Sequence, residues 1–371
     1  MAINTSLFTR CVPIPVAYSA SNETNFVLPL IWNGSNGNVP AEMYNAGTLS
    51  PKSNGSDIRF SSDISGQTEL PFEIVTFTPN ATTINARMLI YVKVPNFSGL
   101  TIYGWWKNAS ATAYAVTDPY GRNACWSNGY VGIFHLNETS GTTAYNSVGG
   151  NDGTYVGTPP SPLVVDTIFG PVHNFANANN NYITLGSGAP WDITGLLAIT
   201  ALVQNTSWTA NWQAIVAKGD AAYRLHRHGG DNYPALDRTL NGGGYVDVTN
   251  TNVFSGLTLV KGIYNPSSGT HVYVNGVDGG LDTTLTATAS TSDVLCIGRN
   301  SVDITRDWNG YIGHVRISNV ARTATWPAAE YNSIVNFATF VTPGTPRYSP
   351  AWLASHVVGE GINEGVGCGI M

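Results

Sequence analysis

Short runs of β-branched and aromatic residues, separated by clusters of Gly, Asn, Asp and Pro, are the feature that most constrains this fold. Such runs predict strands, because these side chains fit a pleated, half-buried surface. Several strands at this spacing predict a β-sandwich, in which two packed sheets each bury one face. In the first third of the chain the expected strands are Asn25–Ile31, Asp57–Phe60, Phe72–Phe77, Met88–Val94 and Thr101–Trp106.

A second set of runs begins at Tyr130 and has the number and spacing of strands of one jelly-roll sandwich. The pair Asn275-Gly276, after the run HVYV, predicts a two-residue hairpin, because a type I′ turn needs positive φ at both positions. The expected strands are Tyr130–Leu136, Tyr182–Leu185, Ala198–Val203, Gln213–Ala217, Tyr223–His226, Leu257–Tyr264, His271–Val274, Val294–Ile297 and Tyr311–Ile317.

The C-terminal part predicts one short helix, Trp326–Phe337, followed by an extended arm rich in Gly and Pro. Thr325 is expected to cap this helix and Glu330 to complement its dipole. Its expected buried stripe is Tyr331, Ile334, Val335 and Ala338, and a further helical turn is expected around Ala351–Val358. We therefore predict an all-β protein of two β-sandwich domains, 1–126 and 127–323, with the helix and arm at 324–371.

Composition excludes several classes of protein. Only 11% of residues are charged, and ten Trp and eighteen Tyr are present, which excludes general disorder. The net charge of −6 argues against a nucleic-acid partner. The sequence contains neither an apolar run of membrane-spanning length nor an N-terminal secretory signal. The four cysteines (Cys11, Cys125, Cys296 and Cys368) are not spaced as zinc ligands; free buried thiols are expected, with a Cys11–Cys125 disulfide as the alternative.

The second set of strands resembles the LamG-type, concanavalin A-like lectin/glucanase jelly roll. Segments that carry the resemblance occur in the family's order. They are VGIFHLNETSGTTAYNSVGGNDGTYVG (131–157), FANANNNYITL (175–185), AIVAKGDAAYRLHRHGG (214–230), LVKGIYNPSSGTHVYVNGV (259–277) and CIGRNSVDITRDWNGYIGHVRISNVART (296–323). The closing strand, which often reads Ile-Asp-Glu-Val in the family, is Ile312-Gly313-His314-Val315 here, so both acids are missing. Residues 50–126 resemble a domain of unknown function that often precedes such jelly rolls.

Enzymatic chemistry is not expected. A glycosidase needs two suitably spaced carboxylates, and the Glu-x-Asp-x-x-Glu type of motif of related glucanases is absent. His226 and His228 lie two residues apart on an expected strand and so could meet one ligand. No third metal ligand is apparent, since the nearest acid is Asp231 in the following loop, and polar residues on a solvated face are the favoured interpretation.

No cofactor is required by this interpretation, although a calcium ion is an open alternative. LamG-type domains often bind calcium at a loop rim, and the candidate oxygen donors are Asn151, Asp152, Asn179, Asn180 and Asn181. Asn-rich turns also occur because Asn tolerates positive φ.

Sugar binding is the function that the loops favour, because exposed aromatic rings stack on the apolar faces of pyranose rings. The alternative is that the Trp residues cap the edges of the core. The candidate ligand-binding residues are Trp208, Trp212, His226, His228, Asn232, Tyr233 and Tyr245.

Together these observations favour a non-enzymatic, phage-like virion protein, either a capsid decoration or a tail-fibre component, at the virion surface. Its expected partners are other subunits of a large assembly, including copies of itself, and cell-surface glycans. The lack of an apparent secretion signal favours a virion assembled in the host cytoplasm. The alternatives are a bacterial or archaeal surface adhesin that binds carbohydrate and, third, a glycoside-active enzyme.

Overall fold

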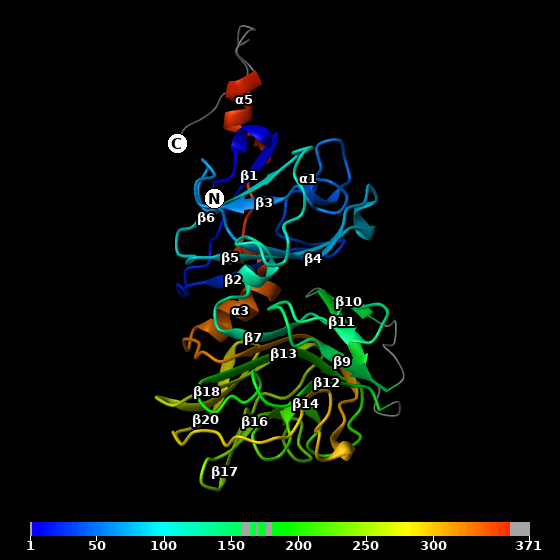
Figure 1. Cartoon of the computed structure of the whole chain (residues 1–371), viewed down its shortest axis with the longest axis vertical. Helices are drawn as coiled ribbons and strands as arrows, with labels where there is room; N and C mark the ends of the chain where they lie inside the picture. Colours follow the sequence, from blue (N-terminus) through cyan, green and yellow to red (C-terminus); the bar gives the residue numbers. More distant parts are fainter. Residues whose placement is uncertain (1, 158–163, 168–169, 176–179, 357–371) are drawn as a thin grey trace.

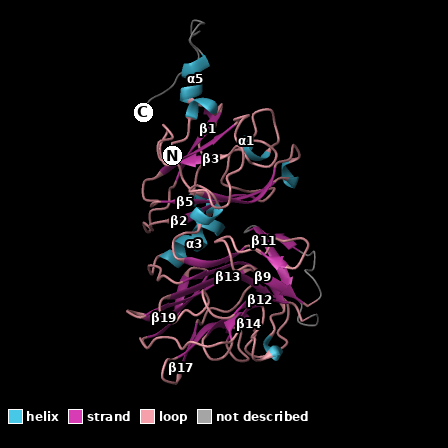
Figure 2. Cartoon of the chain, viewed as in Figure 1, coloured by secondary structure: helices cyan, strands magenta, loops and turns pink. Residues whose placement is uncertain are grey.

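The chain folds into two β-sandwiches stacked along its long axis, with short helices at their junction and at one end (Figure 1). The computed structural model describes residues 2–157, 164–167, 170–175 and 180–356. Strands dominate both sandwiches (Figure 2), which confirms the all-β prediction.

The N-terminal sandwich packs a four-stranded sheet on a three-stranded one. The first sheet has the order β23-β1-β6-β3 and the second the order β2-β5-β4. Because β23 pairs with β1, a segment near the C-terminus completes the N-terminal sandwich. The strands are β1 (Arg10–Pro15), β2 (Phe26–Trp32), β3 (Arg59–Ser61), β4 (Phe72–Thr78), β5 (Arg87–Val94), β6 (Thr101–Trp106) and β23 (Arg347–Tyr348).

The second sandwich packs two eight-stranded sheets around one apolar core. One sheet has the order β10-β11-β22-β13-β18-β19-β20, with β7 also paired to β22, and the other has the order β17-β16-β15-β14-β21-β12-β9-β8. The strands of the first are β7 (Tyr130–Phe134), β10 (Val164–Thr167), β11 (Gly170–Phe175), β13 (Leu197–Asn205), β18 (Thr258–Asn265), β19 (Gly269–Val274), β20 (Val277–Asp282) and β22 (Gly310–Ser318). Those of the second are β8 (Thr143–Ala144), β9 (Gly153–Val156), β12 (Tyr182–Gly186), β14 (Ala214–Lys218), β15 (Tyr223–Arg227), β16 (Pro234–Thr239), β17 (Tyr245–Thr249) and β21 (Leu295–Ile297).

The helices are short, and in the described ranges none is long and apolar enough to cross a membrane. They are α1 (Ala41–Tyr44), α2 (Arg122–Cys125), α3 (Trp326–Val335), α4 (Phe337–Phe340) and α5 (Pro350–His356), with 3-10 turns at η1 (Thr5–Leu7), η2 (Thr83–Asn85) and η4 (Ile304–Arg306). The predicted hairpin at Asn275-Gly276 is present between β19 and β20, with φ values of 52° and 80°.

The outer face of sheet β2-β5-β4 forms part of the junction between the sandwiches. In β5, Ile90 and Val92 point into the N-terminal core, whereas Leu89 and Tyr91 join a second cluster that includes Trp126 of the connecting segment. Both faces of this strand are therefore buried.

Helix α3 lies at the same junction, and its charged residue has a different role from the predicted one. Glu330 is buried and accepts ion-pair hydrogen bonds from Lys261 Nζ at 2.7 Å and from Arg316 Nη1 at 2.6 Å. The prediction that Glu330 complements the helix dipole is therefore wrong, because these strand cations hold its carboxylate.

One further expectation for α3 is wrong, and a second is confirmed for three of its four residues. Thr325 makes no side-chain cap, since its hydroxyl donates to Glu23 Oε1 at 2.6 Å. Of the predicted stripe, Tyr331, Ile334 and Val335 pack in one apolar cluster with strands of the second sandwich, whereas Ala338 is exposed and lies in α4. A further face of α3, with Trp326 and Ala329, packs into the N-terminal core.

The described cysteines are free and buried: Cys11, Cys125 and Cys296. The alternative Cys11–Cys125 disulfide is therefore not formed, and Cys368 lies outside the described residues.

Candidate functional site

The candidate site lies on the outer face of strands β14 to β17, here called the polar face. Along these strands the side chains alternate, so that Leu225 and Leu236 enter the core. His226, Asp237 and Asp247 therefore project from the opposite face of three adjacent strands. Because Asp237 lies directly opposite Asp247 in the ladder, the two carboxylates are cross-strand neighbours.

These three side chains converge on one point. One potential ligand atom from each of His226, Asp237 and Asp247 lies within 4.8 Å of the other two. Nε2 of His226 is 3.0 Å from Oδ1 of Asp237. His226 and Asp237 are buried, whereas the Asp247 side chain is 18% exposed, so the cluster opens toward solvent on the Asp247 side.

Trp212 covers this cluster. Its ring centroid lies 5.5 Å from that of His226 and 5.2 Å from that of His228, and its side chain is partly exposed. The backbone at Trp212 is left-handed, with φ of 60°, and its N–H donates to Gly229 O at 3.0 Å. The structure thus brings together the predicted residues Trp212, His226 and His228.

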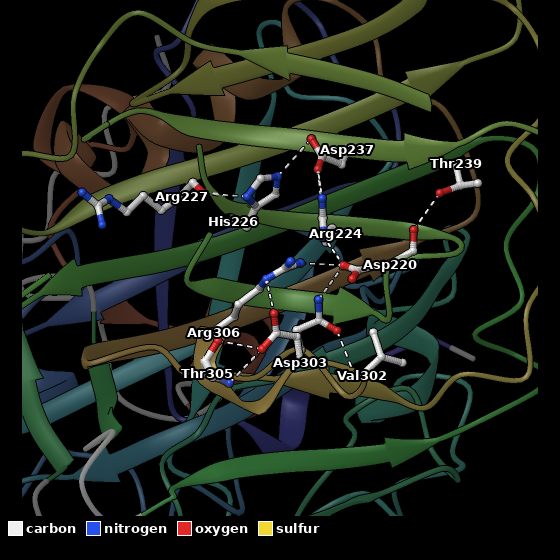
Figure 3. Close-up of polar contacts among 11 residues, drawn as sticks. Asp220, Arg224, His226, Arg227, Asp237, Thr239, Val302, Asp303, Thr305 and Arg306 are labelled. Carbon is white, nitrogen blue, oxygen red and sulfur yellow. Dashed lines mark hydrogen bonds and ion pairs between the residues drawn. The ribbon is translucent and has the colours of Figure 1, made fainter. Parts of the chain in front are cut away.

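A charged network borders the cluster (Figure 3). Arg224 donates from Nε to Asp237 Oδ2 at 2.9 Å and also pairs with Asp220. Asp220 in turn accepts from Arg306 Nη1 at 2.7 Å, and Arg306 pairs with Asp303. Since each of these charges has an opposite partner, the network holds β15 and β16 against the loop before β22.

The two aspartates differ in their acid–base behaviour. Burial disfavours the ionised form of Asp237, but His226 and Arg224 outweigh it and hold the pKa of that carboxyl below its usual range. Burial, followed by the neighbouring Asp237 carboxylate, raises the pKa of Asp247 to about 6. A cation bound between them would favour the ionised form of both groups.

The remaining predicted ligand-binding residues lie around the polar face or beneath it. Trp208 packs against Phe254 and Trp308 at the core edge, the arrangement of a residue that caps the core. Asn232 and Tyr233 lie in the loop after β15, whereas Tyr245, on β17, is 77% exposed.

The structure does not bring the predicted calcium donors to one place. Asn151 and Asp152 come directly before β9, and Asn180 and Asn181 come directly before β12. Because β9 and β12 are antiparallel partners, these two loops lie at opposite ends of the pair. Asn179 lies outside the described residues, and calcium at either loop stays a prediction.

Two residues of the site, Asp237 and Asp247, were not predicted from the sequence. Their segments, PALDRT and YVDVT, do alternate apolar and polar residues. The strand signal is obscured by Pro234 at the start of the first segment and by three glycines before the second segment. The proximity of these carboxylates to His226 follows only from the antiparallel register of β15, β16 and β17.

The jelly roll and its polar face define a lectin-like β-sandwich. Residues 177–326 match the family model of the concanavalin A-like lectin/glucanases superfamily, which confirms the LamG-type resemblance over that range. The search of curated protein sequences found no match.

Solved structures also resemble part of the chain. The binding domain of Paraclostridial Mosquitocidal Protein 1 is 11% identical, with a TM-score of 0.46 over 56% of this chain and 52% of that one. The chain thus spans about half the length of that binding domain. Domain 4 of the arabinanase AbnA from Geobacillus stearothermophilus, solved with arabinotriose, is 16% identical, with a TM-score of 0.43 over 54% of this chain and 96% of that one.

Proposed function

We propose that this chain is a non-catalytic binding protein whose jelly roll holds a glycan on the polar face, over Trp212. The superfamily match of residues 177–326 supports a lectin-like role for this domain. The observation that carries the proposal is the partly exposed Trp212 ring, in the loop before β14. It lies beside His228, and the loop of His228 after β15 also contains Asp231 and Asn232. An aromatic ring with hydrogen-bonding groups around it matches the apolar face and the hydroxyl rim of a sugar.

The ion pairs of the site support binding rather than hydrolysis. A glycosidase needs two carboxyl groups, one that donates a proton to the leaving oxygen and a second that acts as nucleophile or base. Asp237 is buried, its Oδ2 accepts from Arg224 Nε and its Oδ1 faces His226, so this carboxylate is not free to take the second role. We infer that Asp237 orients the site and does not transfer protons to a substrate.

A glycan array followed by titration calorimetry tests this proposal. The full chain is screened, and the strongest glycan is titrated into the wild type, Trp212→Ala and Trp352→Ala. Trp352 is a matched control, because it is a partly exposed Trp on α5, at the far end of the N-terminal sandwich (Figure 1). We expect Trp212→Ala to weaken binding at least about tenfold, the usual effect of removing a central aromatic anchor. An unchanged affinity in Trp212→Ala, or appearance of shortened glycan products, would contradict the proposal.

We also propose, as a second role, that the chain is a subunit of a phage-like particle and is displayed at the virion surface. An exposed edge strand favours contacts between subunits, since it offers free backbone groups to another chain. Strand β20 is such an edge, and its Val277 and Leu281 side chains are 58% and 55% exposed. Light scattering of the wild type and of Val277→Lys/Leu281→Lys tests it: a multimer that dissociates in the variant supports the role, and a monomeric wild type at high concentration opposes it.

A further inference from the structure

We propose that His226, Asp237 and Asp247 bind one divalent transition-metal ion on the polar face. The cluster supplies one imidazole nitrogen and two carboxylate oxygens from three adjacent strands, all within 4.8 Å of one another. The inference does not depend on glycan binding, because it concerns the side chains beneath Trp212.

The hydrogen bonding of His226 is the first line of support. Nδ1 of His226 lies 2.6 Å from the carbonyl oxygen of Arg227, which can only accept a hydrogen bond, so Nδ1 carries a proton (Figure 3). A neutral imidazole in this tautomer presents a lone pair at Nε2. Nε2 lies 3.0 Å from Oδ1 of Asp237, another acceptor. Two acceptors this close are stabilised by a cation, either a proton or a metal ion.

A proton on Nε2 is the alternative cation, and the geometry favours a metal over it. Nε2 of His226 and Oδ1 of Asp237 are close enough for an ion pair, but neither buried atom has a well-aligned hydrogen-bond partner. Oδ1 of Asp247 is also buried without a hydrogen-bond partner. His228 Nε2 lies 3.4 Å from Oδ2 of Asp247, so a proton on His226 still leaves Oδ1 of Asp247 without a partner, whereas one metal ion can contact all three atoms.

The neighbours of the cluster are those that a metal site requires. Metal-binding histidines donate their second ring N–H to a carbonyl or carboxylate, as His226 does to Arg227. Arg224 holds Oδ2 of Asp237 and leaves Oδ1 directed at the cluster. The orientation of both buried ligands is therefore fixed before any ion binds.

The donor set indicates the class of ion. Calcium and magnesium prefer shells made of oxygen, whereas an imidazole combined with carboxylates suits zinc and its first-row neighbours. Two ligands of a tetrahedral zinc ion lie about 3.4 Å apart at bond lengths near 2.1 Å. The partly exposed Asp247 carboxylate can move toward the two buried ligands to reach this distance.

Titration calorimetry of the tag-free, EDTA-treated full chain with ZnCl₂, MnCl₂ and CaCl₂ tests the inference. We expect one Zn²⁺ ion per chain, with Ca²⁺ bound more weakly. Asp247→Asn should weaken Zn²⁺ binding at least about tenfold, because it removes a charged ligand. Asp247 is partly exposed, so this variant should still fold, and circular dichroism checks this.

Asp278→Asn is the matched control. Asp278 pairs with His271 Nδ1 at 2.9 Å on strands β19 and β20, outside the cluster, and its variant should bind Zn²⁺ as the wild type does. A wild type that does not bind Zn²⁺ at millimolar concentration would overturn the inference. Wild-type affinity for Zn²⁺ in Asp247→Asn would also overturn it, as would equal losses of Zn²⁺ affinity in Asp247→Asn and Asp278→Asn. Binding of Co²⁺ with absorption bands that Asp247→Asn abolishes would give independent support.

Discussion

Replacing Glu330 with Gln should destabilise the protein by about 3–5 kcal/mol, the usual effect of removing one partner from a buried ion pair. The Glu330 side chain is only 1% exposed and lies 2.7 Å from Lys261 Nζ and 2.6 Å from Arg316 Nη1. The substitution keeps the shape of the side chain but leaves two buried cations without their counter-charge. Because α3 lies at the junction of the sandwiches, the loss should also reduce the cooperativity between them.

Equilibrium unfolding in urea, followed by tryptophan fluorescence, measures this effect. Asp278→Asn is the control, since it removes one partner of a partly exposed pair and should change stability by less than about 1 kcal/mol. If Glu330→Gln costs no more than the control, the buried cluster does not stabilise the junction and the reasoning is refuted.

The pH dependence gives a second signature of the same cluster. Burial opposes ionisation of Glu330, but Lys261 and Arg316 outweigh it and hold its pKa below the ordinary value. This contribution to stability is present above the unfolded-state pKa of Glu and is lost as the pH falls through the folded-state pKa. Glu330→Gln should therefore lose less stability than the wild type in acid, and equal losses in both proteins would contradict this.

Three further predictions concern single residues. Burial lowers the pKa of His173 to about 4, so protonation of this residue should cost the wild type about 2 kcal/mol of stability between pH 7 and pH 5. Urea unfolding of His173→Phe at both pH values should not show this loss of stability. Gly276→Ala should cost more than about 1 kcal/mol of stability, and more than Gly256→Ala. A Cβ at Gly276 would lie 2.9 Å from the Cα of Ala328, whereas one at Gly256 meets nothing within 4 Å. Equal melting temperatures of the two variants would contradict this. Trp208→Ala should cost about 2–4 kcal/mol through lost packing at the core edge, and a calorimetric melt unchanged from the wild type would show that the ring does not cap the core.

Much of the fold could be predicted from local patterns. The alternation in MLIYVKV places Leu89 and Tyr91 on one face of β5 and Ile90 on the other, and the two apolar clusters match this division. The pattern did not show that both faces are buried, because that depends on the second sandwich. The Asn275-Gly276 hairpin was predicted because its signal is confined to two residues.

The site was harder to predict because its residues meet across strands. His226 lies on β15 and His228 directly follows the end of that strand, so their common side follows from period-two alternation. Asp237 and Asp247 reach His226 only through the register of two hairpins. Glu330 shows the same limit. Its place near the start of the helix predicted an interaction with the helix dipole, whereas the fold places its carboxylate against Lys261.

The central claim is that a glycan binds over Trp212 and is not cleaved. Nuclear magnetic resonance of the full chain, isotope-labelled at the tryptophan indole nitrogen, tests it most directly. The ten Trp residues give separate indole N–H signals, and Trp212→Phe assigns the one from Trp212. On titration with the glycan selected by the array, the account predicts a shift of the Trp212 signal, an unmoved Trp352 signal and a glycan recovered intact. A shift confined to tryptophans of the N-terminal sandwich, such as Trp105 or Trp106, or a glycan that is cut during the titration, would contradict it.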